Sequence, residues 1–417
     1  MIARVLLRVF KLKNLTPPIN FPETSVFGPN ILLTGLTCMA FICTCSGQEA
    51  KPVPAKTFID YFLPTPITDS LSRDAWGASE VGPRDTKNGL EDPAMKQWNY
   101  WDGKIIKGPD GKYHMFASRW DQANGHGGWG GSKAVHAVSD NIIGPYIDKG
   151  LCWPHDQGGK GHNVTALVLP DGRYAVVVSE TRPGDVFVSN SLDGPWEHLG
   201  AIHITPNEFS NLGRMSNVSM MIRPDGNFEI VPRSGAILIS KAGILGPYTV
   251  QGPSIYPKVA GLPLANLEDP VVWYSGGLYH IVVNSWSARK AYHITSTDGI
   301  SDWKFQGLAY DPTTAFVRYT DGTVNHWNKM ERPGVLLENG HVTAVTLAVI
   351  DAPKEQEKGT MGTAARSSSS RSMAPLWIAT CKTLLTRPRL SCSNKATTTS
   401  MRSVGRPNPI HCRRYSG

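Results

Sequence analysis

Short apolar runs alternate with turn residues through the middle of the chain. Five of these turns contain Asp-Gly, Asn-Gly or Gly-Gly, in PDGKY (109–113), PDGRY (170–174), PDGNF (224–228), SGGLY (275–279) and ENGHV (338–342). An apolar run precedes each turn, and the runs that follow are HMFAS, AVVVS, EIVP, HIVVNS and TAVTLAVI. A glycine turn between two such runs is a β-hairpin signal. No period of 3.6 residues is sustained, so the pattern predicts strands rather than helices.

A second phrase follows four of the five hairpins: VSDNIIGPY (138–146), VSNSLDGPW (188–196), ISKAGILGPY (239–248) and TSTDGISDW (295–303). Each predicts a third strand, a turn, and an aromatic residue that opens a fourth strand. Repeats of roughly fifty to sixty residues made of four strands are typical of propeller blades. The sequence therefore predicts an all-β fold, a five-bladed β-propeller over residues 97–358, whose fifth unit lacks the second phrase.

One position of the repeat is polar in all five units. Eight residues before Asp110, Asp171, Asp225, Gly276 and Asn339 stand, in the same order, Asp102, Asn163, Asn217, Glu268 and Glu331. This position is the entry of the innermost strand, and in a propeller the inner strands line the central channel. We therefore expect the five side chains to converge on one pocket at a mouth of that channel. Local capping of turns is the alternative explanation for each of them.

Three carboxylates on one pocket suit the cleavage of a glycosidic bond. One carboxylic acid protonates the leaving oxygen, and one carboxylate attacks the sugar or activates a water molecule. Mutual repulsion and burial raise the pKa of one carboxyl and keep it protonated at neutral pH. Asp102, Glu268 and Glu331 are therefore the candidate catalytic residues.

The chain also resembles a known group of enzymes. The unit D-x(7)-DGKY, which begins at Asp102, and the E-D-P triplet at 268–270 resemble the five-bladed propeller glycoside hydrolases of families 43, 62 and 117. The resemblance covers most of residues 90–351. It implies that Asp102 is the general base and that Glu268 is the general acid.

Two departures make this a divergent member of the group. The resemblance implies a further Asp that tunes the acid, yet Asn163 and Asn217 occupy the entries of the second and third units. Glu331, in MERPG, either replaces that Asp or is itself the acid. The stretch GKGHN (159–163) is similar to the GPGHN of family 43, but it lies in the second unit instead of after the acid.

Further residues extend the predicted substrate site. His162 of GKGHN is a candidate substrate contact or channel ligand, with a structural role as the alternative. The Gly-rich stretch at 120–132 carries Trp120 and Trp129, whose faces are suited to stacking on sugar rings. Arg182 and Arg332, together with Arg119, are candidates for binding a carboxylate or sulfate of a uronic or algal sugar. Pairing with a blade acid is the alternative for each arginine.

The ends of the chain differ from its body. Residues 1–50 are interpreted as an export segment with a start codon placed too early, because the apolar run 31–45 has signal-peptide length. Cys43 or Cys45 is a candidate lipid-anchor site, the one predicted membrane contact. The expected location is outside the cytoplasm: periplasmic, secreted, or an outer-membrane lipoprotein. Residues 51–96 are a chain-entry segment.

Composition narrows the partners and cofactors. The net charge is +8, but much of it lies in the two ends and no aromatic-basic face supports nucleic-acid binding. Only Cys152, of seven cysteines, falls between residues 46 and 380, so the body is expected to hold no disulfide and no cysteine-based zinc site. No cofactor is required, and a structural calcium ion is the one metal left open.

The tail at 359–417 has no strand or helix period and is rich in Ser and basic residues, which is typical of a disordered tail. A second hypothesis is an out-of-frame translation. Reading one nucleotide earlier with suitable synonymous codons gives NDGHGSKIIVIPFDGAPLDRDL, which contains a strand-like run suited to closing the fifth blade. Sequencing the DNA around codon 359 tests this, and an intact frame there rules it out.

These observations predict a carbohydrate-active enzyme. The leading prediction is an exo-acting glycosidase with a carboxylate acid/base mechanism on a plant or algal polysaccharide or oligosaccharide. The alternatives are a propeller polysaccharide lyase on a uronate-linked glycan of the rhamnose–glucuronate type, using His162 and Arg182, and a non-catalytic carbohydrate-binding propeller. A lyase leaves an unsaturated product that absorbs in the ultraviolet, whereas a hydrolase does not.

Overall fold

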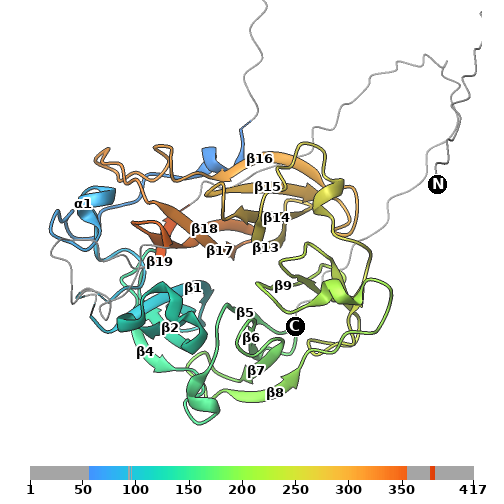
Figure 1. Cartoon of the computed structure of the whole chain (residues 1–417). Coiled ribbons are helices and arrows are strands. Elements are labelled where there is room, and N and C mark those ends of the chain that lie inside the picture. The colour runs from blue at the N-terminus through green and yellow to red at the C-terminus, as the bar shows by residue number, and fades with distance from the viewer. Residues whose placement is uncertain (1–55, 93, 95, 355–375, 381–417) are drawn as a thin grey trace, which may run out of the picture. The chain divides into compact units, whose positions relative to one another are not determined.

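The computed structural model describes residues 56–92, 94, 96–354 and 376–380 (Figure 1). The chain divides into the units Met1–Pro54 and Ala55–Gly417, and all described residues belong to the second. The predicted export segment, with Cys43 and Cys45, lies outside the described residues. No helix within them combines the length and apolar character needed to span a membrane.

The described strands form five antiparallel sheets in chain order. Blade 1 contains β1 (Trp98–Lys107), β2 (Tyr113–Asp121), β3 (Lys133–Ser139) and β4 (Ile147–Leu151). Blade 2 contains β5 (Val164–Val168), β6 (Tyr174–Val178), β7 (Asp185–Ser189) and β8 (Glu197–Ala201). Blade 3 contains β9 (Ser219–Ile222), β10 (Phe228–Val231), β11 (Leu238–Ser240) and β12 (Thr249–Val250). Blade 4 contains β13 (Leu267–Ser275), β14 (Leu278–Ser285), β15 (Lys290–Ser296) and β16 (Lys304–Tyr310). Blade 5 contains β17 (Lys329–Glu338), β18 (His341–Ile350) and β19 (Leu376–Thr380).

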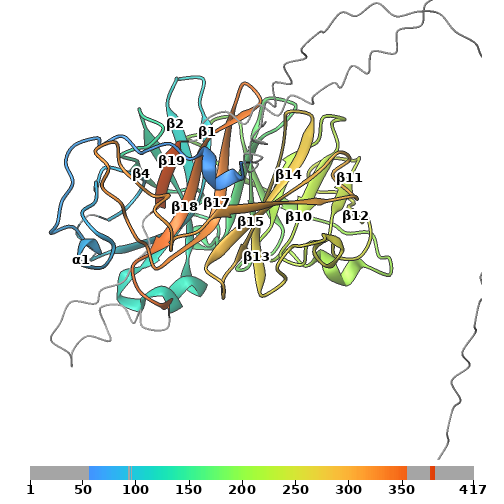
Figure 2. The same ribbon diagram turned by 90° about the horizontal axis from the view of Figure 1, so that it is seen from above.

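The innermost strands close a ring. Strand β1 contacts β5, β5 contacts β9, β9 contacts β13, β13 contacts β17, and β17 returns to β1. Figure 2 shows the closure, with β1 beside β17 and β18 although these strands come from opposite ends of the propeller sequence. The prediction of an all-β, five-bladed propeller is confirmed, with the first strand of each hairpin innermost.

Blade 5 differs from the prediction for the tail. Strand β19 pairs antiparallel with β18, from Ala344 opposite Thr380 to Ala348 opposite Leu376. The expectation that the tail from 359 has no strand is therefore wrong for these five residues. The physical reason is that the outer edge of β18 presents unpaired backbone N–H and C=O groups. An extended segment can form hydrogen bonds with these groups even where its side chains show no strong alternating pattern. The alternative reading frame is untested by this observation.

Short helical turns lie between the strands. They are η1 (Phe58–Tyr61), α1 (Ala78–Val81), η2 (Gln122–Asn124), η3 (His126–Gly131), η4 (Gln157–Gly159), η5 (Ser210–Gly213) and η6 (Tyr256–Lys258). The chain-entry segment is part of the folded body, because η1 lies against β16 (Figure 1) and its Phe58 packs on Trp273 of blade 4. Phe58, Phe62 and Val81 share one buried apolar cluster with residues of blades 4 and 5.

The repeated polar position is one residue away from its prediction in two blades. The residues at the strand entries with left-handed backbone are Asp102 (φ 65°), Asn163 (φ 53°), Asn217 (φ 48°), Asp269 (φ 52°) and Arg332 (φ 48°). In blades 1, 4 and 5 this residue opens a β-bulge in the innermost strand. The structural equivalents of Asp102 are thus Asp269 and Arg332, while Glu268 and Glu331 stand one residue earlier.

The hairpins explain the difference. In blades 1 to 3, five residues separate the last paired residues of the two strands, for example Lys107 and Tyr113. In blades 4 and 5 the turn has two residues. It lies between Ser275 and Leu278 in blade 4 and between Glu338 and His341 in blade 5. Counting back from the turn without a gap therefore shifts the register by one residue. Because successive side chains of a strand point to opposite sides, a shift of one changes which residue faces the centre.

Candidate active site

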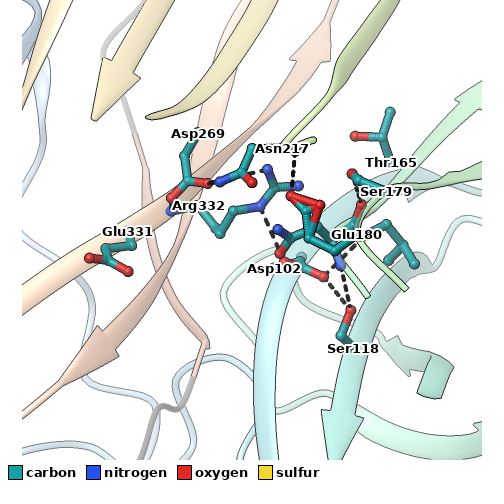
Figure 3. A network of polar contacts seen from close by, with 12 residues as sticks. Asp102, Ser118, Thr165, Ser179, Glu180, Asn217, Asp269, Glu331 and Arg332 are labelled. Atoms are coloured by element: carbon teal, nitrogen blue, oxygen red, sulfur yellow. Dashed lines mark hydrogen bonds and ion pairs between the residues drawn. The ribbon is translucent and has the colours of Figure 1, made fainter. Parts of the chain in front are cut away.

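Arg332 connects the ring of strand entries at the centre of the propeller (Figure 3). Its Nε lies 3.2 Å from Oδ1 of Asp102, and its Nη1 lies 3.4 Å from Oδ1 of Asp269. All three side chains are buried. Burial lowers the pKa of Arg332, but the two carboxylates outweigh that effect and the net shift is upward, so the guanidinium stays charged.

The remaining oxygens of the ring are also hydrogen-bonded. Oδ2 of Asp102 accepts from the Ser118 hydroxyl and from the backbone N–H of Val164, at 3.1 Å for the latter. The side-chain amide of Asn217 donates to Oδ1 of Asp269. Burial nevertheless raises the pKa of Asp102, against the opposing effect of Arg332. The ring is a nearly closed polar layer across the channel.

A cavity of about 400 Å³ lies at the mouth of the channel. Its walls come from all five blades and from the residues after β18: Trp101, His126, Trp129, His162, Asn163, Glu180, Ser216, Asn217, Arg233, Glu268, Asp269, Glu331 and Lys354. A separate void of about 20 Å³, with Asp102 and Arg332 in its lining, lies in the channel and has room for about one water molecule. The larger cavity is the candidate active site, because it combines several carboxylates with aromatic surface.

Glu268 has the electrostatic environment of an acid. It is 9% exposed, and within the part of the chain that the structure describes its one ion pair is with Arg233, whose Nη1 lies 3.4 Å from Oε2. Burial, together with the nearby charges of Asp269 and Glu331, raises the pKa of Glu268 to about 7. A carboxyl with this pKa is protonated in a substantial fraction of molecules at neutral pH.

Glu331 is held differently from Glu268. Its Oε2 pairs with Lys354 and its Oε1 lies 3.4 Å from Nζ of Lys329. Two ammonium groups therefore lie on Glu331, whereas Glu268 has one guanidinium partner among the described residues.

The carboxylates also bear on metal binding. Glu268, Asp269 and Glu331 each offer an oxygen within 4.8 Å of the others, as do the ligand atoms of His114, His136 and Asp193 on the outer part of blades 1 and 2. Each set combines residues of two neighbouring blades, and the convergence of Glu268 and Glu331 agrees with the expectation from the repeat. Arginine or lysine side chains lie beside each of the three cavity carboxyl groups.

Aromatic side chains form one side of the cavity. Trp129 is 41% exposed, and its ring centroid lies 5.1 Å from that of His162. His126 lies 5.0 Å from Trp101. Burial lowers the pKa of His126 to about 3 and that of His162 well below its usual value, so both rings are neutral at physiological pH. A neutral aromatic wall is suited to contact with the face of a sugar ring.

Several predicted site residues are in the cavity. Glu268, Glu331, Asn163, Asn217, His162 and Trp129 all line it. The other predicted residues are placed elsewhere. Trp120 is 2% exposed and donates its indole N–H to the carbonyl of Gly125, so it supports the loop beneath the cavity wall.

The predicted arginines are engaged in ion pairs. Arg182 pairs with Asp156 at 3.0 Å and with Asp185 at 2.6 Å, and Arg119 pairs with Asp148. Arg332 is buried in the ring, and Asp102 beside it does not line the cavity. The structure thus shows Arg182 and Arg332 in the alternative arrangement, each paired with acids of the protein.

Sequence reasoning missed six residues of the lining: Trp101, Glu180, Ser216, Arg233, Asp269 and Lys354. Glu180 and Arg233 follow the second strands of blades 2 and 3, at the same mouth where the first strands enter. Their signal in the sequence is a polar residue directly after the apolar runs AVVVS and EIVP. Only the residues where the first strands begin had been compared. In an antiparallel hairpin, however, the second strand ends at the edge of the sheet where the first strand begins.

Removal of the Arg332 guanidinium is expected to destabilise the propeller. Arg332→Ala leaves Asp102 and Asp269 buried without their cation, which costs about 3–5 kcal/mol. Arg332→Lys keeps the charge but has no planar fork to reach both acids, so an intermediate loss is expected. Chemical denaturation measures both, and Arg173→Ala, a matched change at an exposed turn, is expected to alter stability by less than about 0.5 kcal/mol. Equal stability of Arg332→Ala and the wild type would contradict the role of the ring.

Comparison with known proteins gives structural similarity only. The chain matches no protein-family model, and no curated protein matches it. Among solved structures, it is similar to a family 43 β-xylosidase/α-arabinofuranosidase from a compost microbial metagenome, in complex with xylotriose (13% identity, TM-score 0.46, covering 70% of this chain and 94% of that one).

Two further solved structures are similar at the same level. One is the catalytic domain of a family 62 α-L-arabinofuranosidase from Coprinopsis cinerea (11% identity, TM-score 0.47, covering 71% and 95%). The other is an endo-1,5-α-L-arabinanase from Thermotoga petrophila (14% identity, TM-score 0.41, covering 68% and 72%). Families 43 and 62 are two of those that the sequence resembles. At such low identity, the reaction has to be argued from the residues of this chain's own cavity.

Proposed function

We propose that this protein is a glycoside hydrolase in which Glu268 is the general acid. The observation that carries the proposal is a carboxyl with a pKa of about 7 in a cavity that also holds a second carboxylate and an aromatic wall. In this reaction Glu268 gives its proton to the glycosidic oxygen as the bond to the sugar carbon breaks. A water molecule, or first a carboxylate, forms the new bond to that carbon.

The second carboxylate has two candidates. The sequence resemblance implies Asp102, which is buried in the ring, where Ser118, Val164 and Arg332 already donate to it. Glu180, in contrast, lines the cavity. Oε1 of Glu180 accepts from the Ser216 hydroxyl at 3.0 Å and from the Asn217 N–H at 2.6 Å, and its Oε2 has no hydrogen-bond partner among the described residues. We assign the second carboxylate to Glu180 and a positioning role to Asp102, because a base needs a free oxygen within reach of the substrate.

The floor of the cavity is closed, because the ring of Asp102, Arg332 and Asp269 lies across the channel. The small void lined by Asp102 and Arg332 has room for about one water molecule. A sugar chain therefore reaches the carboxylates from the open face of the propeller. The proposal includes exo-action at the end of such a chain, on an oligosaccharide or polysaccharide of a plant or alga.

The lyase alternative has less support from the geometry. Arg182, expected to neutralise a uronate, is occupied by Asp156 and Asp185 outside the cavity. His162, the expected base, has a strongly lowered pKa and is therefore a weak proton acceptor. A non-catalytic binding propeller does not need a carboxyl of raised pKa, although it would use the same aromatic wall.

The Glu268→Gln variant tests the acid. Loss of a general acid typically costs about 10²–10⁴-fold in rate, and we expect kcat to fall by that amount on plant or algal oligosaccharides. Released sugar and ultraviolet absorbance are read together. Undiminished sugar release by the variant would contradict the assignment, and a new absorbance that the variant retains would favour the lyase.

The pH profile gives an independent test of the same group. The acid must be protonated to act, and the pKa of Glu268 is raised to about 7. We therefore expect kcat to be maintained below pH 7 and to decline as the pH rises through about 7. A decline already complete near pH 4.5, the ordinary value for Glu, would show that another group supplies the proton.

Chemical rescue separates Glu180 from Asp102. Glu180→Ala opens space in the cavity wall, where azide can attack the sugar directly, so we expect sodium azide to restore turnover and yield a glycosyl azide. Asp102→Ala leaves its space in the buried ring, and no rescue is expected there. Rescue of Asp102→Ala with none for Glu180→Ala would return the role of base to Asp102.

A further inference from the structure

A second cavity adjoins the candidate active site. It measures about 650 Å³ and lies over blade 3, where Arg214, Leu212 and Leu267 are part of its lining. Three residues line both cavities: Glu180, Ser216 and Arg233. A sugar chain that places one residue in the active site therefore has a continuous path into this neighbouring space, which we call the blade 3 groove.

Two arginines give the blade 3 groove its charge. The Arg233 side chain is 46% exposed, and the ion pair with Glu268 uses one of its two terminal nitrogens. Arg214 is exposed and forms no ion pair or side-chain hydrogen bond with any described residue. The one carboxylate in the lining, Glu180, already accepts two hydrogen bonds from the protein at one oxygen. The groove thus has unused guanidinium donors and a single acid at its border.

Such a lining is selective for an anionic group on a sugar. Guanidinium groups bind carboxylates and sulfates through paired, charge-assisted hydrogen bonds. Leu212 and Leu267 supply apolar surface for the C–H face of the same sugar ring. The arginines expected from the sequence to bind an anion, Arg119, Arg182 and Arg332, are each neutralised by protein acids, which leaves Arg214 and Arg233 for this purpose.

We propose that the blade 3 groove is a second sugar subsite that takes a residue bearing a carboxylate or sulfate, with Arg214 and Arg233 as its ligands. This inference rests on the proposed function, since it makes the substrate of that active site an acidic glycan. The sugar in the groove is the neighbour of the residue that is cleaved. Arg233, which contacts both Glu268 and the groove, places the anionic group next to the acid.

Direct binding tests the subsite without relying on catalysis. The full chain is titrated by calorimetry with D-galacturonate, D-glucuronate and D-galactose 6-sulfate, and with neutral D-galactose and D-glucose as matched controls. Because hydrogen bonds to charged groups are stronger than those between neutral groups, we expect the acidic sugars to bind at least about tenfold more tightly than the neutral sugars. The advantage should shrink as salt rises, since the arginines are exposed. The carboxylate and sulfate arms show which anionic group is preferred.

Single substitutions locate the binding. Arg214→Gln and Arg233→Gln are each expected to remove most of the acidic advantage. Arg214→Gln, which lies outside the active-site cavity, is expected to leave the binding of neutral sugars unchanged. Arg173→Gln, a matched change at the exposed turn of blade 2, is expected to have no effect. If Arg214→Gln binds D-galacturonate as the wild type does, or if inorganic sulfate alone binds as tightly as the sugar acids, the subsite is disproved.

The outcomes for the subsite and for the hydrolase are separate. Acidic sugars that bind through Arg214, with no hydrolysis of any glycan, would retain the subsite and overturn the proposed function. Hydrolysis that depends on Glu268, with neutral and acidic sugars bound equally, would retain the function and overturn the subsite.

Discussion

The buried ion pairs of Arg332 with Asp102 and Asp269 are the interaction on which the site depends. One guanidinium joins residues of blades 1, 4 and 5, so it connects the first blade to the last two where the ring closes. Each residue has left-handed backbone, which costs energy for a side chain other than Gly and needs support from its surroundings. Two anions and one cation in hydrogen-bonded positions supply that support, whereas an unpaired charge there would be strongly unfavourable.

The ring also decides which groups face the substrate. Asp102 and Arg332 are paired in the channel and do not line the cavity. Glu268 and Glu331, which directly precede Asp269 and Arg332 in the sequence, line its wall. Glu331 is paired with Lys329 and Lys354, whereas Glu268 has the exposed Arg233 as its one ion-pair partner among the described residues. Glu268 combines a pKa raised to about 7 with a place on the cavity wall, which is what the proposed acid needs at neutral pH.

The cavity has two chemically different sides. Blades 1 and 2 contribute Trp101, Trp129 and neutral histidines, which suit the face of a sugar ring. Blade 3 contributes Arg233 and leads to Arg214 in the adjoining groove. Lys354 adds a cation 5.0 Å from the centroid of the Trp101 ring, so aromatic and cationic groups both surround the carboxylates, as an acidic glycan would need.

The five-bladed architecture follows from local patterns in the sequence. Glycine turns such as PDGKY, set between apolar runs, are local signals, and their fivefold recurrence sufficed for the five blades and for Glu268 at the channel mouth. Hairpin formation depends on residues a few positions apart, so it can be predicted from one chain. His162, Asn163 and Asn217 were also predicted in the site and line the cavity, because each lies at or next to a strand entry. Trp129 was predicted from its place in the Gly-rich stretch and lines the cavity from the turn before β3.

The register of the strands and the pairing of charges depend instead on contacts between distant parts of the chain. The two-residue turns of blades 4 and 5 moved Asp269 and Arg332 to the positions that counting had given to Glu268 and Glu331. The occupation of Arg182 by Asp156 and Asp185, and the entry of Glu180, Arg233 and Lys354 into the cavity, depend on which blades lie side by side. Charge pairing acts over a few ångströms in space between residues far apart in sequence, for example Asp102 and Arg332, and no local pattern encodes that proximity.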